Sequence, residues 1–320
     1  KATNLEVGSE LILPVRVEKE GVVAVSGSLF SQILSSLKTN KNLTIEEKDG
    51  GVEIKTIETT VFLKTNPYEE FPLIPRIEAD KKIVIKVKDI ILGIKSVVYS
   101  ASLSTIKPEL GSIYIYQETN TLIFVATDSF RLAEKKIVVK NIEQFPSILI
   151  PYKNALEIVR LFEGVDEEVE FLITKNQISL EHQHIFITSR VVDGVFPDYT
   201  QIIPKENIAT ALVLKQDIIN GIKSLSVFSD KFNQIIFTLT KEGIVLETKN
   251  NDIGEGKTVV VGKVTGEMVK VKFNQKYITD AFSTLTDESI LLSFSEERKP
   301  LVIEGASNKS FKYLVMPMNN

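Results

Sequence analysis

The sequence contains no cysteine and only two histidines, His182 and His184. Without cysteine the chain cannot form disulfides, thiolate nucleophiles, iron–sulfur clusters or cysteine-type zinc sites. No stretch approaches the roughly 20 apolar residues that span a bilayer, and the amino end has no signal-peptide hydrophobic region. These absences argue against a disulfide scaffold and a membrane-spanning protein, and they favour a cytoplasmic location.

The two histidines lie in a segment, 181–184, that is predicted to be a strand. Alternation along a strand places both imidazoles on one face, as in a metal clip, but no third ligand is identifiable. The sequence also has no Gly-x-Ser-x-Gly elbow, so the usual catalytic triads have no obvious parts. We therefore expect a solvated strand face at 181–184, no metal site, no cofactor and no active site.

The composition describes a globular chain with enough apolar material for more than one core. Its 320 residues are 43% hydrophobic and 25% charged, which excludes a disordered or collagen-like protein. The formal net charge is -4, from 38 basic and 42 acidic side chains. Any contact with nucleic acid must therefore use a local cationic surface.

An internal repeat organises the chain. Residues 89–96, Asp-Ile-Ile-Leu-Gly-Ile-Lys-Ser, match residues 217–224, Asp-Ile-Ile-Asn-Gly-Ile-Lys-Ser, at seven of eight positions and an offset of 128. Each copy follows an alternating strand-like run and continues with apolar residues at helical spacing. Phe-Pro pairs at 71–72 and 196–197 repeat at nearly the same offset. Repetition over this length indicates domains rather than a solenoid.

Copies that start near residues 83 and 211 place the start of a first copy before Lys1, so we expect a first domain without its opening half. The remaining half is predicted to be a strand over 10–15, a helix over 26–37, and strands over 43–45, 52–55 and 61–64. The same order recurs with helices over 153–160 and 275–282, followed by strands over 169–173, 177–180, 186–189, 290–294, 300–304 and 313–316. Short polar turns between strands predict antiparallel sheets. The class is α+β, with domains over 1–79, 80–207 and 208–320.

Two polar motifs are more simply interpreted as surface. Residues 254–258, Gly-Glu-Gly-Lys-Thr, contain part of a phosphate-binding loop, but position 251 is Asn251 instead of glycine and a strand, 259–261, follows where a helix is needed. We predict a polar hairpin loop there. The adjacent carboxylates at 166–168 and 296–297 are interpreted as solvated turns.

The segment 126–133, Ala-Thr-Asp-Ser-Phe-Arg-Leu-Ala, follows a predicted strand directly. On chemistry alone it is a turn stabilised by Asp128 and Arg131. The segment also resembles the Ala-Thr-Asp-Gly-His-Arg-Leu-Ala signature of the bacterial sliding clamps, the beta subunits of DNA polymerase III. Residues 192–199, 107–110 and 313–318 are similar to further motifs of that family in the same order, so the resemblance covers the whole chain.

The resemblance implies three similar domains per chain, with antiparallel sheets outside and helices lining a central hole. It implies a homodimeric ring that encircles duplex DNA without reading its sequence, and a nucleoid-associated cytoplasmic location. The predicted helices present cationic positions that would face DNA, namely Lys88, Lys95, Lys153, Arg160, Lys215, Lys223 and Lys276. Phosphate contacts of this kind are weak and sensitive to salt.

The resemblance also implies a groove for short peptides of the polymerase catalytic subunit, the clamp loader and repair proteins. The matching positions are Leu110, Thr127, Ser129, Phe130, Arg131, Leu132, Pro197, Gln201, Ile202, Leu314, Val315, Met316, Pro317 and Met318. Some of these, above all Leu132 and Val315, are alternatively core residues. Ser129-Phe130 replaces the family's Gly-His, and Asn319-Asn320 replaces its Arg-Leu end, so peptide preference is expected to differ.

Ring closure is implied to join the first domain of one chain to the third domain of another by strand pairing. The matching apolar positions are Val61 and Leu63 on one side and Val227 and Phe228 on the other. The function expected is that of a non-catalytic processivity factor. Two alternatives stay open: a nucleotide-binding phosphotransferase using Lys257 and Thr258, and a β-rich repeat protein that does not bind DNA.

Overall fold

The computed structural model describes residues 1–37, 42–78, 82–140, 144–296 and 298–318. The chain divides into two compact units, Lys1–Arg76 with Gln183–Thr188, and Ile77–His182 with Ser189–Asn320. The expected boundary between residues 79 and 80 lies outside the described residues, as does the Asn319-Asn320 end.

The first unit is built from one helix and short antiparallel strands. β1 pairs with β2, and β4 lies between β3 and β5. Its elements are β1 (Ala2–Thr3), β2 (Val7–Leu11), α1 (Gly27–Ser36), β3 (Thr44–Lys48), β4 (Gly51–Lys55), β5 (Thr60–Lys64) and the 3₁₀ turn η1 (Tyr68–Glu70). The order of strand, helix and three strands agrees with the sequence pattern.

The strand predicted over 10–15 is wrong beyond its first two residues, because β2 ends at Leu11. Pro14 has no N–H to donate to a strand ladder. The apolar side chains of Ile12 and Leu13 are about two-thirds exposed, at 67% and 66%. Ile12 N–H still donates to the His184 carbonyl at 3.0 Å, but the described strand stops before Pro14.

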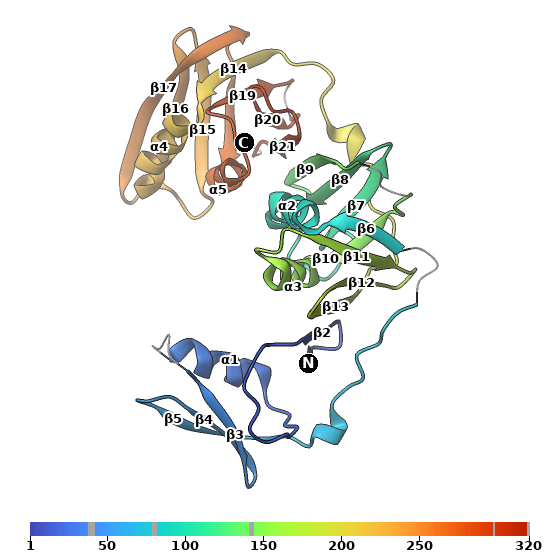
Figure 1. Ribbon diagram of the computed structural model, residues 1–320. Coiled ribbons are helices and arrows are strands. Elements are labelled where there is room, and N and C mark those ends of the chain that lie inside the picture. Colours follow the sequence, from blue (N-terminus) through green and yellow to red (C-terminus); the bar gives the residue numbers. More distant parts are fainter. Residues whose placement is uncertain (38–41, 79–81, 141–143, 297, 319–320) are drawn as a thin grey trace. The chain divides into compact units, whose positions relative to one another are not determined.

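From Lys82 onward the chain contains two copies of one longer order of elements: strand, helix, 3₁₀ turn, four strands, helix and three strands (Figure 1). The first copy consists of β6 (Lys82–Lys86), α2 (Val87–Val97), η2 (Val98–Ser100), β7 (Ser112–Glu118), β8 (Thr121–Thr127), β9 (Arg131–Val138), β10 (Ile148–Pro151), α3 (Tyr152–Phe162), β11 (Glu168–Ile173), β12 (Gln177–His182) and β13 (Ile185–Arg190). The 3₁₀ turn η3 (Tyr199–Ile202) follows it. The second copy consists of β14 (Ala209–Leu214), α4 (Lys215–Leu225), η4 (Ser226–Phe228), β15 (Gln234–Thr240), β16 (Gly243–Asn250), β17 (Gly254–Gly266), β18 (Lys270–Asn274), α5 (Gln275–Asp280), η5 (Ala281–Ser283), β19 (Ser289–Phe294), β20 (Leu301–Gly305) and β21 (Phe311–Val315).

Strand pairing joins the two copies into one long sheet. β9 of the first copy pairs antiparallel with β21 of the second, with Leu132 opposite Leu314 and Arg131 opposite Val315. The sheet runs in the order β10-β7-β8-β9-β21-β20-β19-β14-β17-β16-β15-β18. β6, β11 and β12 form a further antiparallel sheet in the first copy. The α+β class with antiparallel sheets is confirmed.

The helices pack on these sheets through apolar residues at helical spacing. In α2 the buried apolar side chains are Val87, Ile90, Ile91, Ile94 and Val97. α2 contacts β8, β9 and helix α3, while α4 contacts β14, β16 and β17 (Figure 1). The predicted helix over 275–282 is shorter than expected, because α5 ends at Asp280 and the chain continues as η5.

Two further predictions from the sequence are wrong. Residues 254–258 do not form a hairpin loop but begin β17, where Gly256 pairs with Thr248 and Thr258 pairs with Leu246 of β16. His184 is not in a strand with His182, because β12 ends at His182 and His184 lies in the turn that follows. Local sequence did not show where these chain reversals occur.

Candidate functional site

The turn between β8 and β9 is held by its own side chains. The Asp128 carboxylate accepts hydrogen bonds from the N–H groups of Phe130 and Arg131 at 2.9 and 3.0 Å, and from Arg131 Nε at 3.0 Å. Thr127 Oγ1 donates to the Arg131 carbonyl at 2.7 Å and accepts from the Ser129 N–H at 3.1 Å. The predicted turn stabilised by Asp128 and Arg131 is confirmed.

Ser129 has a φ of 77°, in the left-handed region where glycine is least strained. The family signature has glycine at this position, so the turn is preserved although the residue differs. Serine accepts this conformation at a modest cost, which the hydrogen bonds of Asp128 and Thr127 offset.

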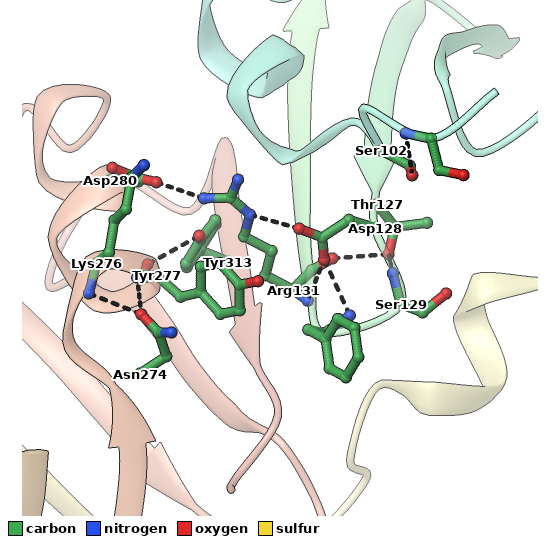
Figure 2. A network of polar contacts seen from close by, with 12 residues as sticks. Ser102, Thr127, Asp128, Ser129, Arg131, Asn274, Lys276, Tyr277, Asp280 and Tyr313 are labelled. Carbon is green, nitrogen blue, oxygen red and sulfur yellow. Dashed lines mark hydrogen bonds and ion pairs between the residues drawn. The ribbon is translucent and has the colours of Figure 1, made fainter. Parts of the chain in front are cut away.

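The Arg131 guanidinium reaches from this turn to helix α5 of the second copy (Figure 2). Arg131 Nη1 is ion-paired with Asp280 Oδ2, and the guanidinium carbon lies 4.6 Å from the centre of the Tyr277 ring. The side chain of Arg131 is only 11% exposed. Burial acts to lower the pKa of Arg131, but the neighbouring Tyr313 and the two carboxylates raise it overall. The group is therefore a fixed cation.

An apolar cluster lies beside the turn and spans both copies. It consists of Ile123, Val125, Leu132, Leu149, Phe196, Tyr199, Val302 and Leu314. Leu132 and Leu314 are each 1% exposed, which favours the core interpretation for both. Val315 is completely buried as well. These residues pack beneath the surface that the turn forms.

The 3₁₀ turn η3 is anchored on this cluster. The Tyr199 hydroxyl donates to Glu134 Oε2 at 2.5 Å and lies 2.8 Å from the Tyr116 hydroxyl. Burial, followed by the hydrogen bond to Glu134, raises the pKa of Tyr199. Gln201 donates from Nε2 to Asp198 Oδ2 at 2.8 Å. Tyr199 thus fixes the segment that carries Gln201.

Exposed apolar side chains surround the buried cluster. Phe130 is 61% exposed and Ile202 is 45% exposed. The chain after β21 passes close by, since the Met316 N–H donates to the Phe130 carbonyl at 2.8 Å and the Met318 N–H to the Lys272 carbonyl at 2.9 Å. Aromatic, aliphatic and methionine side chains together form an adaptable apolar surface.

The structure thus brings most of the predicted groove residues together. Thr127, Ser129, Phe130, Arg131 and Leu132 adjoin Leu314, Val315 and Met316 through β9 and β21, and Pro317 and Met318 continue from them. Pro197, Gln201 and Ile202 flank the anchored Tyr199. Leu110 lies in another turn, 8% exposed, where its carbonyl accepts from the Ser102 N–H at 2.8 Å.

The cationic positions predicted to face DNA all lie on helices. Lys88 and Lys95 belong to α2, Lys153 and Arg160 to α3, Lys215 and Lys223 to α4, and Lys276 to α5. Within each of the helices α2, α3 and α4 the two cations are seven or eight residues apart, which places them on one face of the helix about two turns apart. The arrangement is suited to following a phosphate backbone.

Several of these cations are already paired. Lys88 Nζ lies 2.8 Å from Asp166 Oδ1, Lys95 is ion-paired with Glu163, and Arg160 contacts Glu157 at 3.2 Å. Lys215 donates to the Leu285 carbonyl at 2.6 Å. Among the described residues, the exposed Lys153, Lys223 and Lys276 have no ion-pair partner.

Two strand edges lie at or next to the positions for which the resemblance implies a chain-to-chain contact. β5, which carries Val61 and Leu63, is an edge strand of its three-stranded sheet. β17 pairs with β16 over 254–261 but with β14 only over 262–266. The outer side of 254–261 is therefore free of a strand partner within the part of the chain described.

Val227 and Phe228 lie in η4, next to this free edge and not on it. A Cβ added at Gly256 would lie 2.7 Å from the Leu225 side chain and 2.9 Å from that of Phe228. Val227 is 68% exposed, and Val261 of β17 is 72% exposed. Apolar side chains thus flank the free half of β17.

The described residues contain no group of three or more His, Cys, Asp or Glu side chains that could hold a metal ion. His182 Nε2 lies 3.3 Å from Glu167 and its ring is 14% exposed, so it is a partly buried residue with its own partner. Lys257 Nζ lies 3.3 Å from Glu247 Oε1 on the neighbouring strand, which does not resemble a phosphate loop. No helix among the described residues is long and apolar enough to cross a membrane.

Comparison with known proteins identifies the family. The model for the DNA polymerase III beta subunit, central domain, matches residues 84–198, and that for the C-terminal domain of the same subunit matches residues 200–319. The chain belongs to the DNA polymerase III beta subunit family. The beta sliding clamps of Synechococcus elongatus and Vibrio cholerae are 23% and 25% identical to it, with 99% of this chain covered in both cases and 86% and 87% of theirs.

Solved structures show the same fold. The DNA polymerase III beta subunit of Thermotoga maritima superposes with a TM-score of 0.90 at 23% identity, covering 100% of this chain and 87% of that one. A Pseudomonas aeruginosa sliding clamp bound to griselimycin gives 0.86 at 22% identity, covering 99% and 87%. The clamp fold is confirmed, and so is the function: this is a DNA sliding clamp of DNA polymerase III, an accessory subunit without a catalytic role of its own.

Two features of this clamp were not predicted from the sequence. Asp280, the partner of Arg131, lies 149 residues away, and no local pattern marks it. Residues 254–258 were predicted to be a loop in front of a strand over 259–261, whereas β17 already begins at Gly254. In the sequence, the apolar run at 259–261 was the signal for this strand.

Proposed function

We propose that two copies of the chain form a ring around duplex DNA, with β5 of one copy pairing with the free half of β17 of the other. Each strand has an unpaired edge and apolar neighbours, which is a liability in a monomer and favours pairing. The observation that carries the proposal is the free edge of β17 over 254–261. Domains over 1–79, 80–207 and 208–320 belong to the same proposal.

Light scattering tests ring formation. We expect a mass of about twice 35.8 kDa and a monomer for Val227→Asp, because a charge buried in the contact has no partner. Val138→Asp is the matched control, since Val138 is 75% exposed on β9, which pairs with β8 and β21 and not with β17. A dimeric Val227→Asp variant would contradict this interface.

We propose that the cationic helix faces contact DNA phosphates and do not read bases. Lys153, Lys223 and Lys276 are exposed and lack an ion-pair partner among the described residues, so they carry most of this contact. Screened attraction to phosphates is independent of sequence and permits sliding. Retention then depends on the closed ring, consistent with a net charge of -4. A cytoplasmic, nucleoid-associated location follows from this role.

The surface around Phe130, Ile202 and Met316 is proposed to bind short peptides of the polymerase catalytic subunit, the clamp loader and repair proteins. The Pseudomonas aeruginosa clamp was solved with griselimycin bound, and we propose this surface as the griselimycin site of the present chain. Phe130 replaces a histidine of the family signature, so the preferred peptides are expected to place an apolar group against it.

Calorimetric titration with griselimycin tests the groove. Met316→Ala is expected to weaken binding about tenfold or more, as for loss of a side chain central to a contact. Ile57→Ala, at an 80% exposed turn residue of the first unit, should leave binding unchanged. Equal affinity of the Met316→Ala variant and the unaltered chain would refute the groove.

A further inference from the structure

Three charged side chains connect the β8–β9 turn with helix α5. Arg131 Nε lies 3.0 Å from Asp128 Oδ2, and Arg131 Nη1 is ion-paired with Asp280 Oδ2 (Figure 2). Asp128 and Arg131 belong to the first copy of the repeat and Asp280 to the second. The three groups cross the junction of the copies at the turn that carries Phe130.

These groups are mostly enclosed. The side chains of Arg131, Asp128 and Asp280 are 11%, 15% and 27% exposed. The guanidinium also lies over the Tyr277 ring, and the Tyr277 carbonyl accepts from the Tyr313 hydroxyl at 2.8 Å. If the guanidinium turned toward a ligand, it would lose its contacts with the Asp128 and Asp280 carboxylates and with the Tyr277 ring. Little water could replace these contacts, because the site is mostly enclosed.

The same turn is also joined to the second copy through the backbone, by the hydrogen bond from Met316 N–H to the Phe130 carbonyl and by the pairing of Arg131 with Val315 across β9 and β21. The position of the exposed Phe130 ring relative to Met316 therefore depends on how firmly the turn is held. Asp128 holds the turn internally, whereas Asp280 holds it against the second copy. Removal of Asp280 leaves the local turn intact but releases this second attachment.

We infer that Arg131 is a positioning residue of the groove, held by Asp280, and that it does not itself contact the bound ligand. The inference rests on the proposed peptide groove and assigns a role to Asp280, which lies outside the predicted groove residues. Arginine suits this role because its planar fork bonds two carboxylates at once, whereas a lysine ammonium is a point charge.

The experiment combines griselimycin calorimetry with ¹⁵N NMR of the arginine side chains. Asp280→Asn keeps the shape and removes the charge. We expect it to weaken binding about three- to tenfold, the size of one ordinary hydrogen bond, and to speed exchange of the Arg131 Nε proton. Asp280→Glu should restore affinity to within about twofold, and Arg131→Lys should bind as weakly as Asp280→Asn. Asp49→Asn, in an exposed turn of the first unit, is the matched control.

The possible results separate the inference from the groove itself. Unchanged affinity in Asp280→Asn with clear loss in Arg131→Ala would mean that Arg131 contacts the ligand, and would overturn the inference alone. An unchanged Arg131 exchange rate in Asp280→Asn would also overturn it, because Asp280 would not be holding the guanidinium. Failure of the unaltered chain to bind griselimycin would instead refute the proposed groove, and the inference with it.

Discussion

Helices α2 and α4 occupy the same place in the two copies of the repeat, but they meet their sheets differently. At Gly93 of α2, an added Cβ would lie 2.4 Å from the fully buried ring of Phe124. At Gly221 of α4, an added Cβ would lie 3.1 Å from the side-chain ends of Leu246 and Val260. Helix α2 therefore packs against a rigid aromatic ring, whereas helix α4 packs against aliphatic side chains that can move slightly.

Helices α2 and α4 also differ in how their cations are neutralised. In the first copy, Lys88 and Lys95 are paired with Asp166 and Glu163. In the second, Lys223 is exposed and has no such partner among the described residues. The position of the helix is therefore repeated in the two copies, whereas the unpaired charge that it exposes is not. The strength of the proposed DNA contact can thus change without a change in the fold.

The largest expected effect concerns the glycines. Gly93→Ala should destabilise the clamp by about 2 kcal/mol, since overpacking a rigid site costs more than the helix propensity that alanine gains. Gly221→Ala should change stability by less than about 1 kcal/mol, because the two effects nearly cancel there. Urea unfolding of both variants measures the two changes in the free energy of unfolding. Equal destabilisation would mean that α2 and α4 do not differ in how tightly they pack on their sheets.

The next effect concerns DNA binding. Lys223→Ala with Lys276→Ala should weaken binding to short linear duplex about tenfold and lower the salt slope by about 2, one for each phosphate that is no longer neutralised. Lys88→Ala with Lys95→Ala should cost less than half as much on a logarithmic scale. Fluorescence anisotropy over a range of salt concentrations compares the pairs. A greater effect of the first-copy pair would invert the comparison.

Removal of the acidic partners tests the same difference from the other side. Glu163→Gln with Asp166→Asn frees two lysines of the first copy, so we expect duplex binding to tighten about threefold at low salt. The gain should disappear when Lys88 and Lys95 are also replaced by alanine. Unaltered affinity in the acidic double variant would show that these lysines do not face DNA.

The smallest expected effect is a change in one titration. The hydrogen bond from Lys88, together with its charge, holds the pKa of Asp166 below its ordinary value of 3.8. The stability that the Lys88–Asp166 pair adds to the folded state is fully present at pH values above the ordinary pKa of Asp166. It is lost as the pH falls through the lowered pKa that Asp166 has in the folded protein. Lys88→Met should return the Asp166 pKa upward, as measured by carboxyl NMR. A pKa that stays in place would mean that the pair does not form in solution.

Much of this architecture could be predicted from local pattern. The repeat at 89–96 and 217–224 predicted two helices in equivalent places, and apolar residues at helical spacing become the buried faces of α2 and α4. The turn at Asp128 and Arg131 was predicted because its hydrogen bonds form within a few residues of each other.

What escaped prediction depends on distant parts of the chain. The pairing of Arg131 with Asp280 requires β9 to lie beside β21, which no short window contains. The segment after Leu11 is rich in apolar residues, yet β2 ends at Leu11. The extent of β17 escaped for a related reason, since its glycines favoured a loop locally and its pairing with β16 decided otherwise.

Retention on circular DNA tests the central claim most directly. Clamp loaded onto a nicked circular plasmid should stay with the DNA through gel filtration in high salt, and should be released once the plasmid is cut to a linear molecule with free ends. This result follows from a closed ring with only weak phosphate contacts. Equal retention on circular and linear DNA would contradict encirclement, since affinity alone would then hold the protein.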